Sequence, residues 1–85
     1  MNIYVGNLGY GIDDNDLQTL FEEYGTVQSS NVIVDKHSGR SKGFGFVTME
    51  NDVEAKKAIS KLNGTVIEER EIVVNEARPK NNDKF

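Results

Sequence analysis

The sequence predicts an α+β fold in which a four-stranded sheet carries two helices on one face. Short β-branched and aromatic segments alternate with two helical stripes, in the order strand, helix, strand, strand, helix, strand. Two strand–helix–strand units with right-handed crossovers place both helices on the same side of the sheet. The opposite face of the sheet is therefore expected to be open to water.

The first half of the chain is expected to form a strand, a helix and a second strand. Residues 3–8, IYVGNL, are β-branched or aromatic and run into a glycine-rich turn, which is typical of a strand. Asp13 is expected to cap the helix, and Gly25 to close it in the left-handed conformation. The apolar stripe of this helix, at i, i+3, i+4 and i+7, consists of Leu17, Leu20, Phe21 and Tyr24. Residues 27–34 are predicted as the second strand.

The second half begins with a polar loop over residues 35–42 and a third strand over residues 43–49, GFGFVTM. Asn51 can cap the next helix, and Glu54 follows at the spacing of a capping box. The apolar stripe of this helix consists of Ala55, Ala58, Ile59 and Leu62.

The last elements set the expected limits of the domain. Asn63 and Gly64 are interpreted as the stop of the second helix, and residues 72–74 as the fourth strand. The domain is therefore expected to span residues 1–79, followed by a flexible polar tail at residues 80–85.

Composition limits the kinds of function that the chain can have. It has 85 residues, no cysteine and a single histidine, His37, so we expect no disulfide, metal site, catalytic triad or cofactor. No apolar run is long enough to span a membrane, and the N-terminus lacks a signal-peptide pattern. We expect a soluble, monomeric domain in the cytoplasm, or in the nucleus of a eukaryotic cell.

Alternation along the strands places aromatic residues on the open face of the sheet. Within residues 3–5 the two β-branched side chains suit the core, so Tyr4 should point outward. Within residues 43–49, Val47 and Met49 belong under the helices. Because side chains alternate, Phe44 and Phe46 should then point toward water. Exposed rings promote aggregation unless something covers them.

Single-stranded RNA is a ligand that such rings suit. Unstacked bases lie on ring faces, and each stacked base is worth about 1–3 kcal/mol. Gly43 and Gly45 beside the rings fit a place where another chain approaches closely. The open face is therefore predicted to hold two or three nucleotides.

Two segments resemble the motifs of a known family. Residues 42–49, KGFGFVTM, are similar to the longer RNP octapeptide of the RNA-recognition motif, and residues 3–8, IYVGNL, resemble its shorter hexapeptide. The order and spacing of the elements from residue 2 to about residue 79 also resemble that family. The resemblance implies a ferredoxin-like sandwich with an antiparallel sheet in the order 4-1-3-2.

The resemblance also implies which residues contact the RNA. The stacking surface would be formed by Tyr4, Phe44 and Phe46. Polar and basic candidates at strand ends and in the loop before the third strand are Lys42, Arg40, Asn7, Asn75 and Arg78. Lys42 is expected on a phosphate, whereas Tyr10 and Tyr24 are assigned to packing. Single-stranded DNA remains a second possible ligand, because stacking does not read the 2′-hydroxyl.

The chain departs from the family pattern at two places. Met49 replaces the usual aromatic residue at the end of the octapeptide, but this position should face the core and leave stacking untouched. Residues 68–70, Glu-Glu-Arg, occupy a turn where glycine is common, which puts the geometry of that turn in question.

The charge of the chain is unusual for a nucleic-acid binder, since it totals −4 at pH 7. Residues 13–23 hold five acidic residues and no basic one, and residues 68–76 hold four acidic residues against Arg70. Most of the acid is expected on the helical back and at one edge, with a modest number of cations around the rings. Binding should depend on stacking and have a shallow salt dependence.

We expect a non-enzymatic RNA chaperone or post-transcriptional regulator, similar to compact bacterial and plant glycine-rich RNA-binding proteins. One alternative is a protein-interaction module on the same fold, which the acidic balance leaves open and the retained aromatic residues oppose. The other is a small enzyme such as an acyl phosphate hydrolase, but residues 6–11, GNLGYG, carry no cation to hold a phosphate.

Overall fold

The computed structural model describes residues 1–77. In chain order the elements are β1 (Asn2–Gly6), α1 (Asp14–Glu22), β2 (Val27–Val34), β3 (Ser41–Met49), α2 (Asp52–Leu62), β4 (Val66–Ile67), β5 (Arg70–Glu71) and β6 (Val73–Glu76). Residues 78 and 79 of the predicted domain and the predicted tail, residues 80–85, lie outside the described part.

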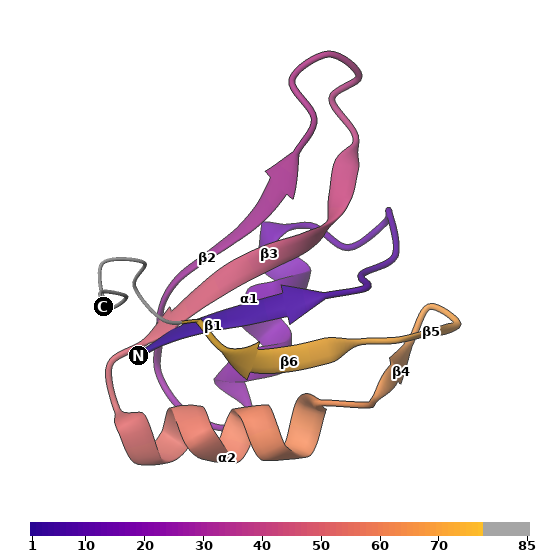
Figure 1. Ribbon diagram of the computed structural model, residues 1–85. Coiled ribbons are helices and arrows are strands. Elements are labelled where there is room, and N and C mark those ends of the chain that lie inside the picture. The colour runs from indigo at the N-terminus through magenta and orange to yellow at the C-terminus, as the bar shows by residue number, and fades with distance from the viewer. Residues whose placement is uncertain (78–85) are drawn as a thin grey trace, which may run out of the picture.

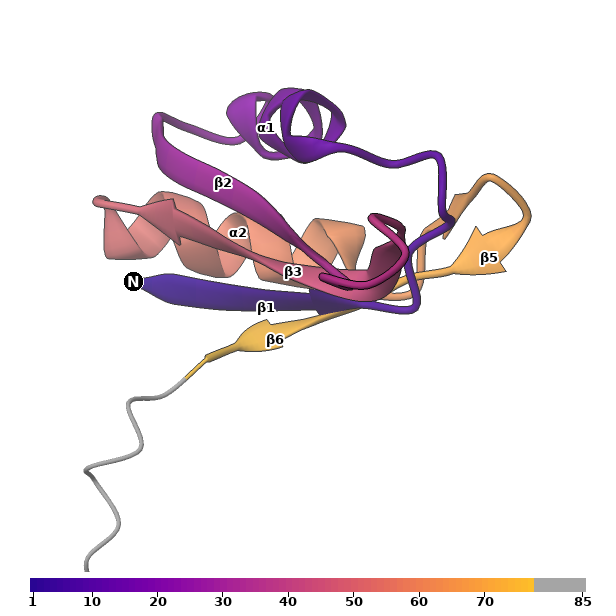
Figure 2. The ribbon, with the colours of Figure 1, turned by 90° about the horizontal axis from the view of Figure 1, so that it is seen from above.

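The main sheet is antiparallel, with the strand order β2-β3-β1-β6. This confirms the predicted order 4-1-3-2, because the fourth predicted strand is β6. Both helices lie on one side of the sheet, and Figure 1 looks onto the other side, which no element within residues 1–77 covers. Figure 2 shows the two layers from above. The predicted open face is therefore present.

The core fills the space between the sheet and the helices. The two helices contribute Leu17, Phe21, Ala55, Ala58 and Leu62. The strands and the adjoining loops contribute Ile3, Val5, Leu8, Ile12, Val47, Met49, Ile72 and Val74. Both stripes predicted from helical spacing therefore face the sheet, where apolar burial stabilises the fold. Within residues 1–77 neither helix is long and apolar enough to cross a membrane.

The start of α1 is fixed by a reciprocal capping box. The Asp16 backbone N–H donates to Asp13 Oδ1 at 2.9 Å, and the Asp13 N–H donates to Asp16 Oδ2 at 3.2 Å. The cap predicted at Asp13 is confirmed. The pair satisfies two backbone donors and puts negative charge at the positive end of the helix dipole.

The start of α2 shows only half of the capping box that its spacing predicts. The Glu54 N–H donates to Asn51 Oδ1 at 3.0 Å, as expected. The Glu54 carboxylate turns away, however, and Oε1 accepts from the Thr26 N–H at 3.4 Å. Its side chain thereby ties α2 to the segment that follows α1.

The same contact corrects the role assigned to Gly25. The C-terminal cap of α1 is Glu23 in the right-handed conformation, and Gly25 has no positive φ. A Cβ at Gly25 would instead collide with the Glu54 side chain. The glycine gives room to a residue of α2, whereas Gly64, with a φ of +85°, ends α2 as predicted.

A two-residue hairpin of β4 and β5 is the element that the sequence did not predict. Its turn residues, Glu68 and Glu69, have φ of 53° and 68°, and Ile67 pairs with Arg70. Positive φ at both positions is characteristic of a type I′ turn, which favours asparagine, aspartate and glycine. Because glutamates are not typical of such a turn, the sequence did not predict the hairpin. The unusual residues noted at positions 68–70 are the turn and the first residue of β5.

Candidate nucleic-acid interface

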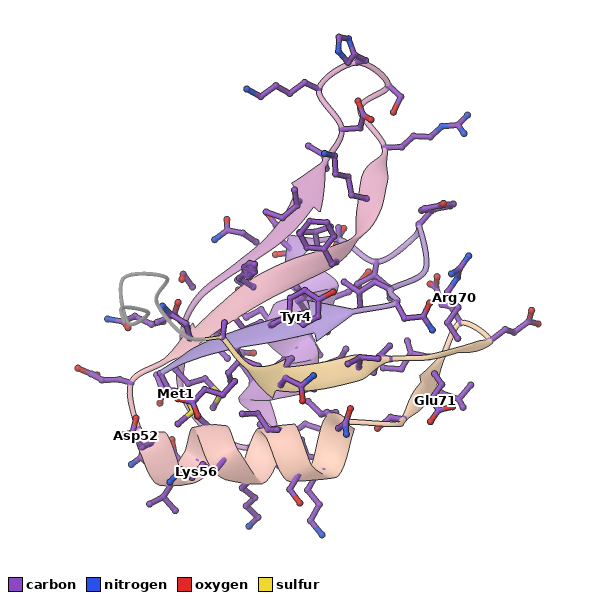
Figure 3. The ribbon with its side chains drawn as sticks, in the orientation of Figure 1. Met1, Tyr4, Asp52, Lys56, Arg70 and Glu71 are labelled. Atoms are coloured by element: carbon purple, nitrogen blue, oxygen red, sulfur yellow. The ribbon has the colours of Figure 1, made fainter. Side chains whose placement is uncertain are left out.

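Three aromatic rings gather at the centre of the open face. The ring centroids of Tyr4 and Phe44 are 6.0 Å apart, those of Tyr4 and Phe46 5.8 Å, and those of Phe44 and Phe46 6.2 Å. Tyr4 and Phe46 are direct partners across β1 and β3. Phe46 is 37% exposed and the other two rings are half-buried. Figure 3 shows Tyr4 in the middle of this face. We call these three residues the ring platform.

Strand alternation accounts for the position of the platform. Ile3 and Val5, on either side of Tyr4, are fully buried beneath the helices. Val47 and Met49 are also fully buried, so the departure from the family pattern at Met49 lies in the core, as predicted.

Gly6 and Gly45, next to the rings, make room for different neighbours. A Cβ at Gly6 would lie 2.5 Å from the Tyr4 hydroxyl oxygen and 2.8–2.9 Å from two ring carbons, so Gly6 lets the Tyr4 ring lie along β1. A Cβ at Gly45 would lie 2.5 Å from the Asn31 carbonyl oxygen and 3.1 Å from Leu17 Cδ1. The protein's own chain therefore makes a close approach at Gly45, on the helix side.

Polar residues surround the platform on the neighbouring strands. Asn31 of β2 lies opposite Phe46, and Asn75 of β6 lies opposite Tyr4. The Thr48 hydroxyl donates to Asn2 Oδ1 at 3.1 Å. Asn75 was predicted from the sequence, whereas the other polar residues were missed, because their placement depends on strand register. Hydrogen bonds to base edges require such groups beside a stacking surface.

Three cations lie in the β2–β3 loop and at the start of β3. Lys42, Arg40 and Lys36 are exposed, and none forms an ion pair with a carboxylate within residues 1–77. The loop is held by Asp35, whose N–H donates to the Arg40 carbonyl at 2.7 Å and whose carbonyl accepts from the Gly39 N–H at 2.8 Å. These side chains are therefore available to phosphates near the rings.

Asn7 has a structural task at the end of β1. Its φ is 57°, its Nδ2 donates to the Glu71 carbonyl at 2.8 Å, and its Oδ1 accepts from Arg70 Nη1 at 3.3 Å. These bonds tie the end of β1 to the β4–β5 hairpin. Contact between Asn7 and a base stays a prediction, and Arg78 lies outside the described residues.

Tyr10 differs from its predicted role. Tyr24 packs against the core as expected, but Tyr10 is 67% exposed. The Arg70 guanidinium carbon lies 5.5 Å from the Tyr10 ring centroid, a cation–π distance. The sequence could not show this pair, because its members are brought together by the unpredicted hairpin.

Residues 1–77 contain no group of three or more histidine, aspartate or glutamate side chains that could hold a metal ion. The arrangement offers flat apolar rings, amide and hydroxyl groups, and a few cations. Such a surface can bind an unpaired strand through its bases with little charge neutralisation.

The chain is similar in sequence to known RNA-binding proteins. The sequence model of the family described as the RNA recognition motif matches residues 3–73. The chain is 53% identical over 75 residues to a chloroplastic 29 kDa ribonucleoprotein of Arabidopsis thaliana, covering 88% of this chain and 22% of that protein. It is 44% identical over 82 residues to RbpA of Synechocystis, a cyanobacterial protein named as RNA-binding, covering 96% of this chain and 81% of that one.

A solved structure is similar over nearly the whole of both chains. The crystal structure of RNA-binding protein PG1 superposes with a TM-score of 0.88 at 48% identity, covering 94% of this chain and 99% of that chain. By contrast, the chain spans only 22–30% of the length of the first two chloroplastic relatives. The likeness to those larger proteins therefore concerns one of their parts.

Proposed function

This chain belongs to the RNA recognition motif family, and we propose that it binds single-stranded RNA by stacking bases on Tyr4, Phe44 and Phe46. The observation that carries the proposal is the position of the three rings, which lie within 6.2 Å of one another on the sheet face that the helices leave open. The names of RbpA and PG1 as RNA-binding proteins support it.

The platform has room for a short stretch of nucleotides. At about 1–3 kcal/mol for each stacked base, three rings contribute about 3–9 kcal/mol, and a micromolar dissociation constant corresponds to roughly 8 kcal/mol. Asn31, Asn75 and Thr48 add hydrogen-bonding groups at the edges of the platform. We expect micromolar affinity with limited sequence preference.

Lys42 and Arg40 supply the phosphate contacts in this proposal. For single strands the logarithm of the affinity falls with the logarithm of the salt concentration by about 0.7 for each neutralised phosphate. Two contacts therefore give a slope near −1.4. This shallow slope reconciles RNA binding with the net charge of −4.

The proposed biological role is that of a protein that binds RNA without changing it chemically. We propose a non-enzymatic, monomeric domain that acts as an RNA chaperone or post-transcriptional regulator, with single-stranded DNA as a second ligand because stacking does not read the 2′-hydroxyl. We assign this activity to the cytoplasm or nucleus, with an organelle as the alternative because several relatives are chloroplastic.

An NMR titration with a pool of short randomised RNA tests the proposal. The wild type should show shifts at the ring platform and on β6, and the double variant Phe44→Ala/Phe46→Ala should stay folded and lose most binding. A matched control is Val53→Ala, because Val53 on α2 is 77% exposed and lies on the helical side. Equal binding by the double variant and the control would overturn the proposal, and would leave a protein-interaction role as the alternative.

A further inference from the structure

A groove continues from one edge of the ring platform. It runs between the loop that joins β1 to α1 and the β2–β3 loop, is open to solvent, and has a volume of about 430 Å³. Its lining includes Tyr10, Arg40, Lys42 and Phe44. Phe44 belongs to both the platform and the groove, so a strand lying on the platform can pass into the groove without leaving the surface.

Tyr10 gives the groove an aromatic wall. The ring is 67% exposed, more than any ring of the platform. Arg70, whose guanidinium carbon is 5.5 Å from the ring centroid, does not line the groove, so it supports Tyr10 from another side. Arg70 is itself held by Asn7 at 3.3 Å, and Figure 3 shows it beyond the end of β1, to one side of Tyr4.

The other wall of the groove is basic. Arg40 and Lys42 are exposed and form no ion pair with a carboxylate within residues 1–77. Asp35 is the one acidic residue among those that line the groove, and its Oδ1 accepts from the His37 N–H at 2.7 Å and the Ser38 N–H at 3.4 Å. The Asp35 carboxylate therefore accepts hydrogen bonds within its own loop, and the side chains of Arg40 and Lys42 are available to bind an anion.

We propose that this groove is a further nucleotide subsite, in which a base stacks on Tyr10 and the phosphates on either side of that nucleotide lie at Arg40 and Lys42. The ligand is the next part of the same strand that covers the platform, so the inference rests on the proposed function. The subsite accepts any base, because every base has a stacking face. Arg70 acts as a positioning residue that holds the Tyr10 ring beside the strand.

The dependence of affinity on RNA length tests the subsite. Oligouridines of three and six nucleotides are titrated against the wild type and Tyr10→Ala, with binding measured by calorimetry. Tyr10→Ala should weaken binding of the longer RNA roughly 5- to 150-fold and leave binding of the shorter RNA unchanged. Tyr10→Phe should retain the wild-type length dependence. Tyr10→Leu, which keeps apolar bulk without a ring, should lose it.

The outcomes separate this inference from the proposed function. If Tyr10→Ala binds both lengths as the wild type does, or weakens both equally, the subsite is overturned and the platform stands. If Phe44→Ala/Phe46→Ala also binds both lengths normally, the platform itself fails.

A direct readout uses the tyrosines. The variant Tyr4→Phe/Tyr24→Phe leaves Tyr10 as the only tyrosine in a chain without tryptophan. Its emission should be quenched by the six-nucleotide RNA and not by the three-nucleotide RNA. Saturation with the longer RNA without quenching would overturn the subsite.

Discussion

The two faces of β3 use the same strand for different purposes. One face carries Gly45, Val47 and Met49, all buried against the helical layer. The other carries Phe44 and Phe46 on the ring platform, where Phe46 is 37% exposed. Because alternate residues point to opposite sides, the residues that form the core and those that form the candidate site share a backbone but few contacts. Stability and binding should therefore respond separately to substitution.

The largest expected effect is on stability, from Met49→Ala. Met49 is fully buried, and truncating a buried methionine costs about 2–5 kcal/mol through lost apolar contact and the cavity left behind. Urea unfolding should show this loss, while RNA affinity of the folded variant stays at the wild-type value. A fall in affinity equal to that of a platform variant would show that the two faces are coupled.

The matching change on the other face is Phe46→Ala. Loss of one stacking ring should weaken RNA binding by about 1–3 kcal/mol, or roughly 5- to 150-fold. The urea midpoint should change less than in Met49→Ala, because Phe46 is partly exposed already. Calorimetry with a short oligouridine measures the first quantity, and the comparison fails if Phe46→Ala alters stability more than affinity.

Much of this two-faced arrangement was predictable from the sequence. Val47 and Met49 mark the core side of β3, and the period of two then places Phe44 and Phe46 outside. The caps at Asp13 and Asn51 were also local signals, because each bonds a residue three positions away.

The features that were not predictable depend on contacts between distant segments. The Glu54 side chain of α2 lies against Gly25, which follows α1 in the chain. The Arg70 side chain of the β4–β5 hairpin lies over the Tyr10 ring. The turn of that hairpin uses Glu68, whose carboxylate would lie 2.7 Å from a Cβ at Gly9. Neither local propensity nor periodicity reports such contacts, so the turn and the groove became visible only in three dimensions.

A pair of glycine substitutions sharpens the comparison between the faces. Gly45→Ala pushes a Cβ against the Asn31 carbonyl on the helix side, and overpacking of this kind costs about 1–3 kcal/mol of stability. Gly6→Ala instead displaces the Tyr4 ring on the open face, so it should lower RNA affinity more than stability. Thermal unfolding and RNA titration of both variants check this. Equal effects on the two quantities in either variant would contradict it.

The smallest expected effect concerns charge at the end of the open face, in Lys42→Gln. If Lys42 neutralises one phosphate, the slope of log affinity against log salt should become shallower by about 0.7, with little change in affinity at high salt. Lys57→Gln is the matched control, because Lys57 is also exposed, lies on α2, and its replacement changes the net charge by the same amount. If both variants alter the slope equally, the salt dependence of RNA affinity reflects only the overall charge of the protein. A change confined to Lys42→Gln would place a phosphate at that end of β3, because a local contact releases a counterion that a distant charge does not.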